Sequence, residues 1–236
     1  MVLSESCIAH GIIGLMIRGG RSRDWNYCLG LSYDPRTRLT CGLIQGLEFG
    51  EIEQLRKCLR LSQEHFWQPA LVPLFLIELK THFFAVLLER RASGLEETEY
   101  ETGMKHGFSL DPRRNPALSL ERRKSRVNLD FDPITQKLTG LTGTLAFCDL
   151  TFGSSLHSLE VTVALTQRIM ENTSRDRSGG ICQSAAALER RATYLKTLIV
   201  GAQAHRNVLL QRTRAQVQTV STAVASISDF VAYFDS

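Results

Sequence analysis

The residue types that most often carry metal or nucleophilic chemistry are scattered along this chain of 236 residues. Zinc sites and redox pairs use short spacings such as Cys-x-x-Cys, which neither the cysteines nor the histidines form. The phosphate-binding, dinucleotide-binding, zinc-protease and serine-hydrolase motifs are also missing from the sequence. We therefore expect no catalytic residue, no metal site, no cofactor and no enzymatic activity. The scattered residues are Cys7, Cys28, Cys41, Cys58, Cys148 and Cys182, and His10, His65, His82, His106, His157 and His205.

Four carboxylates lie close together in an acidic run, at Glu96, Glu97, Glu99 and Glu101. Hard divalent cations such as Mg²⁺ bind carboxylate oxygens, although a run without fixed geometry binds them weakly. A solvated surface has the same composition, and we favour that interpretation. A divalent cation is a conceivable partner for which the sequence offers no site.

A basic segment follows the acidic run. Residues 103–128 combine high charge with few apolar residues, which is typical of an exposed, partly disordered linker. Its cations could bind anionic lipid or nucleic acid, but without interleaved aromatic residues they are poorly suited to stacking on single strands. The net charge of +4 does not by itself indicate nucleic-acid binding, and we favour a solvated loop. The basic residues concerned are Arg113, Arg114, Arg122, Arg123, Lys124 and Arg126.

Strands are expected near the N-terminus. The apolar stretch Cys7–Ile17 fits a short strand or an irregular buried segment better than a helix, because each of its two glycines would cost a helix roughly 1 kcal/mol. Apolar residues alternate with polar or small ones between Trp25 and Gln45, which predicts a hairpin with its turn at Asp34-Pro35-Arg36-Thr37.

A turn centred on Pro35 and Arg36 would place Gly30 opposite Cys41. Cys28 and Cys41 would then be diagonal neighbours on the more polar face of the hairpin. A redox pair is conceivable there, but cysteines scattered along a cytosolic chain favour reduced thiols throughout.

Two helices are expected next. Apolar residues at spacings of three and four predict a short amphipathic helix within Gly50–Gln63. A longer helix should begin at Gln68-Pro69 and run to Ser93, with Gly94 as its stop signal. It is apolar nearly all round and therefore expected to be buried. Three polar residues interrupt its apolar run, which favours a core helix over a membrane span; they are Glu78, Lys80 and His82.

Helix is expected to resume at Asp132-Pro133, break at Gly153-Ser154-Ser155 and end before Asn172. The resulting division is residues 1–102 with the hairpin and first helices, 103–128 as the linker, and 129–236 with a helical hairpin and a long C-terminal helix. We expect the first and last parts to form one fold unit.

The C-terminal segment has the most regular pattern, because apolar positions alternate by four and three residues from Leu188 to Phe234. The step from Thr213 to Val217 is four residues, although the alternation would require three. Such a stutter-like shift locally unwinds a coiled coil. A continuous helix here would be roughly 70 Å long, so we expect a break near Gly201 or a projecting end that needs a partner. In the second case the exposed helix stripe would be Val217, Val220, Val224, Ile227, Val231 and Phe234.

Short segments of the helical part carry a family resemblance. They are Tyr194-Leu195-Lys196, Arg206-Asn207-Val208-Leu209-Leu210, Gln216-Val217-Gln218-Thr219-Val220, His65-Phe66-Trp67-Gln68-Pro69 and Leu71-Val72-Pro73-Leu74. Over roughly residues 60 to 228 the chain resembles the cytosolic part and stalk helix of uncharacterised fungal proteins related to the CorA divalent-cation transporters. The resemblance implies a cytosolic α/β-plus-stalk domain. It also favours a homo-oligomer, because CorA relatives assemble as pentamers.

The chain departs from that family at its C-terminal end. In the family the stalk runs into two membrane helices, the first of which ends in a Gly-Met-Asn pore motif. Here the sequence stops at Ser236 without such helices, and Gly103-Met104-Lys105 lies in a polar loop and is not that motif. The resemblance therefore implies a chain that cannot conduct ions by itself. It is a truncated gene model, a fragment or a stand-alone descendant.

The sequence as a whole predicts an α+β, mainly α fold with a small N-terminal β region and a long stalk-like helix. The function we expect is that of a non-catalytic CorA-like module that acts through helix-mediated self-association or partner binding. The alternative is a peripheral protein that binds a membrane surface or nucleic acid through residues 113–126. We expect a cytoplasmic location, on the cytosolic face of a membrane if the chain is a fragment.

Overall fold

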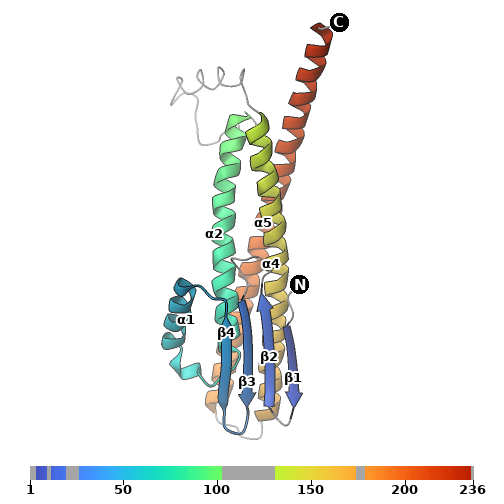
Figure 1. The fold of residues 1–236 in the computed structure, drawn as a ribbon. Coiled ribbons are helices and arrows are strands. Elements are labelled where there is room, and N and C mark those ends of the chain that lie inside the picture. Colours follow the sequence, from blue (N-terminus) through green and yellow to red (C-terminus); the bar gives the residue numbers. More distant parts are fainter. Residues whose placement is uncertain (1–3, 10–11, 20–26, 103–130, 174–178, 235–236) are drawn as a thin grey trace. The chain divides into compact units, whose positions relative to one another are not determined.

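The computed structural model describes residues 4–9, 12–19, 27–102, 131–173 and 179–234 (Figure 1). It confirms an α+β fold that is mainly α. The strands are β1 (Ser4–Ala9), β2 (Ile12–Gly19), β3 (Tyr27–Asp34) and β4 (Leu39–Gln45). The helices are α1 (Phe49–Leu61), the short 3₁₀ helix η1 (Gln63–His65), α2 (Leu71–Glu101), α4 (Phe131–Thr173) and α5 (Gly179–Phe234).

The chain divides into two compact units, and each of the three longest described helices contributes to both. Unit 1 consists of Met1–Phe84 and Leu150–Ala202, and unit 2 of Ala85–Asp149 and Gln203–Ser236. Each unit therefore joins residues that precede the basic segment to residues that follow it.

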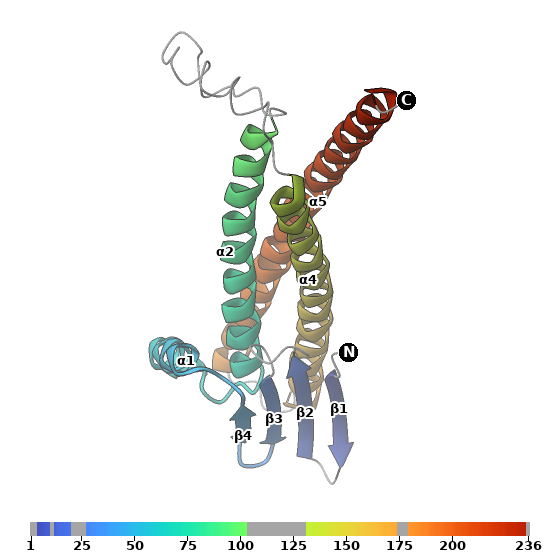
Figure 2. The same cartoon turned by 45° about the horizontal axis from the view of Figure 1, so that its top comes forward.

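The strands of unit 1 form one antiparallel sheet in the order β1-β2-β3-β4 (Figures 1 and 2). The described residues of the stretch Cys7–Ile17 are strand, which was one of the two predicted possibilities, but they belong to two strands that pair with each other, Ala9 with Ile12. Residues on one face of the sheet are buried in alternation; in β2 and β3 they are Ile13, Leu15, Ile17, Tyr27, Leu29, Leu31 and Tyr33. This face supplies the sheet side of the apolar core in unit 1.

The β3–β4 hairpin exists, but the predicted register was wrong by two residues. Asp34 pairs with Leu39, so the turn is longer than predicted and Ser32, not Gly30, lies opposite Cys41. The Asp34 carboxylate accepts hydrogen bonds from the Arg36 N–H (2.9 Å) and the Thr37 hydroxyl (3.1 Å), which stabilises this longer turn. A shift of two keeps every side chain on its predicted face.

The predicted diagonal neighbours Cys28 and Cys41 are therefore separated along the ladder, since Cys28 pairs with Gln45. Both are free thiols, as are Cys58 and Cys148. The side chains of Cys7 and Cys182 lie outside the described part of the structure.

The predicted helix within Gly50–Gln63 is confirmed as α1, which buries Leu55. Helix α2 differs from its prediction at both ends, because it begins at Leu71 and continues through Gly94 to Glu101. Leu95, Thr98 and Glu99 are all buried beyond the glycine. Their packing and hydrogen bonds outweigh the roughly 1 kcal/mol that a glycine costs a helix.

The predicted break at Gly153-Ser154-Ser155 was also wrong, because α4 is one helix of 43 residues. Phe152 and Leu159 are buried on either side of this point, and the Phe152 ring meets Phe84 edge-on at 6.1 Å between centroids. The predicted helical hairpin within 129–172 is thus a single helix. Helix α5 likewise runs without a break past Gly201 for 56 residues.

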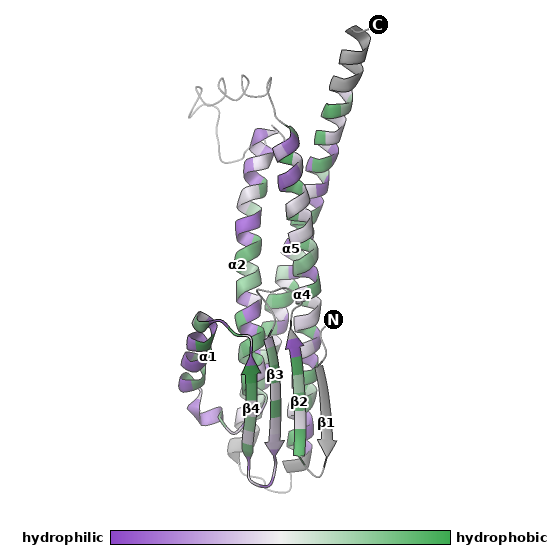
Figure 3. Ribbon diagram, viewed as in Figure 1, coloured by the Kyte–Doolittle hydropathy of each residue, from purple (hydrophilic) through white to green (hydrophobic). Residues whose placement is uncertain are grey.

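Among the described helices, α2 is long and apolar enough to cross a membrane by length and composition. Figure 3 shows that the apolar residues of α2 gather in its first half and hydrophilic ones in its second. More than half of the apolar window is buried inside the structure, a property that core helices of soluble proteins share.

Candidate interaction site

The buried side of α5 follows an unbroken four-three spacing, which corrects the predicted stutter. Its last buried positions are Leu209, Thr213, Gln216 and Val220. The pattern stays in phase because Gln216, a polar residue, takes the position after Thr213. The predicted step to Val217 was therefore wrong, because it passed over Gln216 as a core position.

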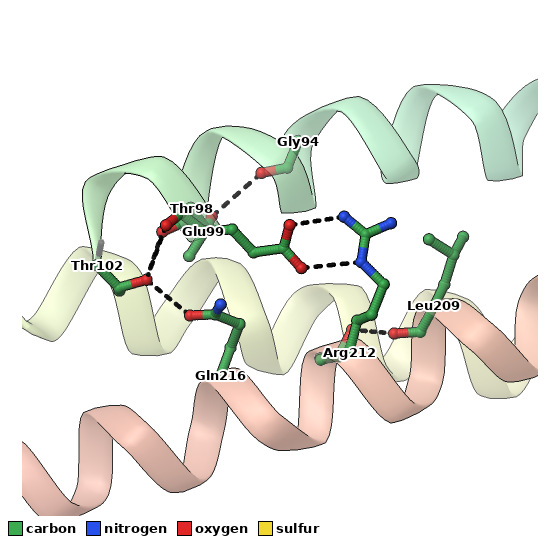
Figure 4. A network of polar contacts seen from close by, with 8 residues as sticks. Gly94, Thr98, Glu99, Thr102, Leu209, Arg212 and Gln216 are labelled. Carbon is green, nitrogen blue, oxygen red and sulfur yellow. Dashed lines mark hydrogen bonds and ion pairs between the residues drawn. The ribbon is translucent and has the colours of Figure 1, made fainter. Parts of the chain in front are cut away.

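In unit 2, two polar contacts tie α5 to the end of α2 (Figure 4). Arg212 donates to the Glu99 carboxylate through Nε to Oε1 (2.8 Å) and Nη2 to Oε2 (2.6 Å). The Thr102 hydroxyl donates to Gln216 Oε1 (2.8 Å). The hydrogen bonds to Glu99 raise the pKa of Arg212, so the guanidinium stays charged. A bidentate pair fixes both distance and rotation between two helices.

A second anchor ties α5 to α4 in the same unit. Arg206 Nε donates to the backbone oxygen of Leu145 (3.0 Å), and its Nη2 lies 3.6 Å from Asp149 Oδ2. Cys148 lies beside them without solvent exposure, and burial raises the pKa of its thiol to about 11. The thiol is therefore neutral at physiological pH and has packing as its role rather than nucleophilic chemistry.

Beyond these anchors α5 continues past the end of α2 and the start of α4 (Figures 1 and 2). Among the side chains that the structure describes, Val220 is the last buried one, and residues 221–226 are all exposed or half-buried. Val217 and Val224 are 43% and 42% exposed and lie seven residues apart, on one side of the helix. This end of α5, residues 217–234, is referred to below as the projecting segment.

The predicted exposed stripe needs one correction. Val220 is only 5% exposed, because it shares the side of α5 that carries Gln216 and faces the chain's own helices. Val217 and Val224 are exposed as predicted. The side chains of Ile227, Val231 and Phe234 lie outside the described part, although the helix itself extends to Phe234.

The acidic run was predicted to be a solvated surface, and this is wrong for part of it. Glu99 is buried against Arg212, and Glu101 lies 3.3 Å from Lys137 Nζ. Among the described residues, no group of three or more His, Cys, Asp or Glu side chains is arranged to hold a metal ion. These carboxylates contact the chain's own cations instead.

Two polar contacts connect elements of unit 1, one between Arg191 and Glu78 and one between His65 and Ser184. Arg191 of α5 donates to Glu78 of α2 (Nε to Oε2, 3.0 Å) and covers the Phe75 ring at 4.5 Å. His65 Nδ1 and the Ser184 hydroxyl are 2.8 Å apart. These contacts join α2, α5 and the segment before α2, so their roles are structural.

Lys80 is the most unusual charged group of unit 1. It is 9% exposed, and its Nζ lies 3.8 Å from the centre of the Tyr27 ring. Burial lowers the pKa of Lys80 to about 8, although the charge of Glu51 opposes this shift. Burial also raises the pKa of the Tyr27 hydroxyl. A cation held over an aromatic face is stabilised by the ring quadrupole.

The basic residues Arg113–Arg126 lie outside the described residues, so lipid or nucleic-acid binding by this segment stays a prediction. The sequence matches no protein-family model and no curated protein sequence.

The anchors were missed at the sequence level because their partners are far apart in the chain, by 61 residues for Arg206 and Leu145 and by more than a hundred for the contacts of Arg212 and Gln216. The signal that could have found them is the unbroken spacing obtained when Gln216 is allowed as a core residue.

Proposed function

We propose that this protein is a non-catalytic, CorA-like cytosolic module that works by self-association through the projecting segment of α5. The observation that carries the proposal is that α5 continues to Phe234, whereas Val220 is the last of its described side chains that is buried. At 1.5 Å per residue, the remaining helix is about 20 Å long. An isolated helix of this length is marginal in water, so a partner that covers it would stabilise it.

The chemistry of the segment suits a helical partner. Val217 and Val224 are exposed at a spacing of seven residues, and Val231 continues that spacing in the sequence. β-branched residues that repeat every seven positions favour two-stranded coiled coils. A second copy of the chain would supply the same stripe, and the resemblance to CorA stalk helices supports a homo-oligomer.

The hydrogen bonds of Arg212 and Gln216 attach the base of the projecting segment to α2. Arg212 and Gln216 hold α5 just before it begins to project, and Val220 packs beside them. A force or contact at the projecting segment would therefore be passed to α2 through hydrogen bonds that fix the rotation of α5. This is what an association module requires.

The proposal is tested by measuring the mass of the full chain in solution by light scattering at tens of micromolar. We expect a mass above that of one chain, and a return to one chain in the double variant Val217→Asp/Val224→Asp. The matched control is Ala215→Asp/Thr222→Asp, which adds the same charge at exposed positions on the side of the helix that points away from the buried face. The control should keep the wild-type mass.

Circular dichroism should give the same helix content for both double variants. A wild-type chain that remains a monomer with α5 fully helical would overturn the proposal. Equal loss of mass in the two double variants would also overturn it, because added charge alone would then account for the effect.

A further inference from the structure

A hollow lies under the edge strand of the sheet in unit 1. The inward positions of β4 are Thr40, Gly42 and Ile44, which pair with Tyr33, Leu31 and Leu29 of β3. At Gly42 the Leu31 side chain occupies the place that a Cβ atom would take, so the space lies beside Leu31 rather than at the glycine itself. The space measures about 200 Å³ and is lined by Leu29, Leu31, Thr40, Gly42, Ile44, Leu59, Phe66, Gln68, Leu71 and Val72.

Two polar atoms of this lining are buried and lack a hydrogen-bond partner within the described residues: Gln68 Oε1 and Thr40 Oγ1. Gln68 is 2% exposed, and its backbone is fixed on both sides. Its N–H donates to the His65 oxygen (2.9 Å), and its own oxygen accepts from the Leu71 N–H (3.1 Å). The backbone of Gln68 is therefore fixed at the start of α2, and its side chain lines the hollow.

Buried polar atoms in proteins are nearly always hydrogen-bonded, so two such atoms in one hollow indicate a group that pairs with them. The amide oxygen of Gln68 needs a donor, whereas the Thr40 hydroxyl can donate or accept. A hydroxyl group satisfies both kinds of atom, because it donates one hydrogen bond and accepts others. The remaining walls are mostly apolar, which suits a hydrocarbon body.

We propose that this hollow binds a small apolar molecule that carries a hydroxyl group, of the size of an alkylphenol. An apolar cavity of about 150 Å³ holds a benzene molecule, so the hollow has room for one ring with a short substituent. The half-exposed Phe66 lies at its rim and leaves a path from solvent. The hydroxyl of the guest would donate to Gln68 and pair with Thr40.

The test compares p-cresol with toluene, which has the same ring and methyl group but lacks the hydroxyl. Binding to the full chain is measured by isothermal titration calorimetry and by ligand-observed NMR. We expect p-cresol to bind about tenfold more tightly than toluene, which corresponds to one buried hydrogen bond.

Gln68→Leu removes the acceptor at nearly constant volume, and we expect it to lower p-cresol affinity to the level of toluene. Gln54→Leu is the matched control, because Gln54 is exposed on α1, and it should bind p-cresol as the wild type does. Thr40→Val provides a second variant if Gln68→Leu fails to fold, and it should reduce the preference for p-cresol in the same direction.

Several results would overturn the proposal. No binding of either compound at millimolar concentration would mean that water alone satisfies the two atoms. Equal affinity for p-cresol and toluene would also contradict it, as would a p-cresol preference that survives in both Gln68→Leu and Thr40→Val.

Discussion

Arg212 of α5 donates two hydrogen bonds to the Glu99 carboxylate of α2, with Nε 2.8 Å from Oε1 and Nη2 2.6 Å from Oε2. Glu99 is 7% exposed, and these hydrogen bonds compensate for the burial of its carboxylate. The pair occurs one turn before Gln216, which bonds to Thr102 at the end of α2. These contacts attach α5 to the end of α2, and Val220, one turn further along α5, is still buried.

Loss of Arg212 should destabilise the protein strongly. Arg212→Met leaves the Glu99 carboxylate buried without its partner, and we expect the free energy of unfolding in urea to fall by about 3 kcal/mol. The double variant Glu99→Leu/Arg212→Met should return to within about 1 kcal/mol of the wild type, because the buried charge is then removed as well. Lys137→Met breaks the exposed pair with Glu101 and should cost less than about 1 kcal/mol. A similar cost for Lys137→Met and Arg212→Met would contradict this prediction.

Stability should rise with pH because of Lys80. Its pKa is about 8 in the folded chain against 10.5 in the unfolded one. Between pH 8 and 10 the unfolded chain therefore binds more protons, and the free energy of unfolding increases as the pH rises. We expect a slope of about 1 kcal/mol per pH unit at most, measured by urea unfolding at pH 7, 8, 9 and 10. Lys80→Met should lack this contribution. We limit the measurement to pH 10, because above this pH the unfolded chain loses the Tyr27 proton more readily than the folded chain does. This lowers the free energy of unfolding and opposes the effect of Lys80. Equal slopes in wild type and Lys80→Met would contradict the assignment.

The cysteines should differ in reactivity according to burial. Cys41 is exposed, whereas Cys148 is buried and burial raises its thiol pKa to about 11. Brief treatment of the native protein with iodoacetamide at pH 8 should label Cys41 well before Cys148, as read by peptide mass spectrometry. Unfolding in urea should remove the difference. Early labelling of Cys148 in the native chain would mean that α4 and α5 separate readily around Arg206.

Glycines inside the long helices should tolerate alanine. A Cβ atom added at Gly94 or Gly153 would meet no other group within 4 Å, so each Gly→Ala variant should gain about 0.5–1 kcal/mol of stability. Gly42→Ala is the opposite case, because the new Cβ would collide with Leu31 Cδ2, and this variant should lose stability. Thermal unfolding of the three variants distinguishes these outcomes. A loss of stability in Gly153→Ala would indicate that α4 does bend or break there, as the sequence suggested.

The spacing of apolar residues and the residues typical of turns were sufficient to predict which segments are strands and which are helices. Alternation predicted the β3–β4 hairpin, and spacings of three and four predicted the helices, because burial of one face imposes those periods on the sequence. The same signals misplaced the helix ends at Gly94 and Gly153. A glycine weakens a helix by only about 1 kcal/mol, and whether the helix ends there depends on packing supplied by distant residues such as Phe84 for Phe152.

The sequence by itself determined the α+β, mainly α character, the amphipathic faces and the exposure of Val217 and Val224. Only the tertiary structure decided that Gln216 and Glu99 are core residues, because each becomes acceptable when a partner from another helix satisfies its hydrogen bonds. The hollow beside Gln68 likewise required the sheet register that places Thr40 and Gly42 on the inner face of β4. Periodicity records which side of an element is buried, whereas the identity of the groups that meet there depends on contacts across more than a hundred residues.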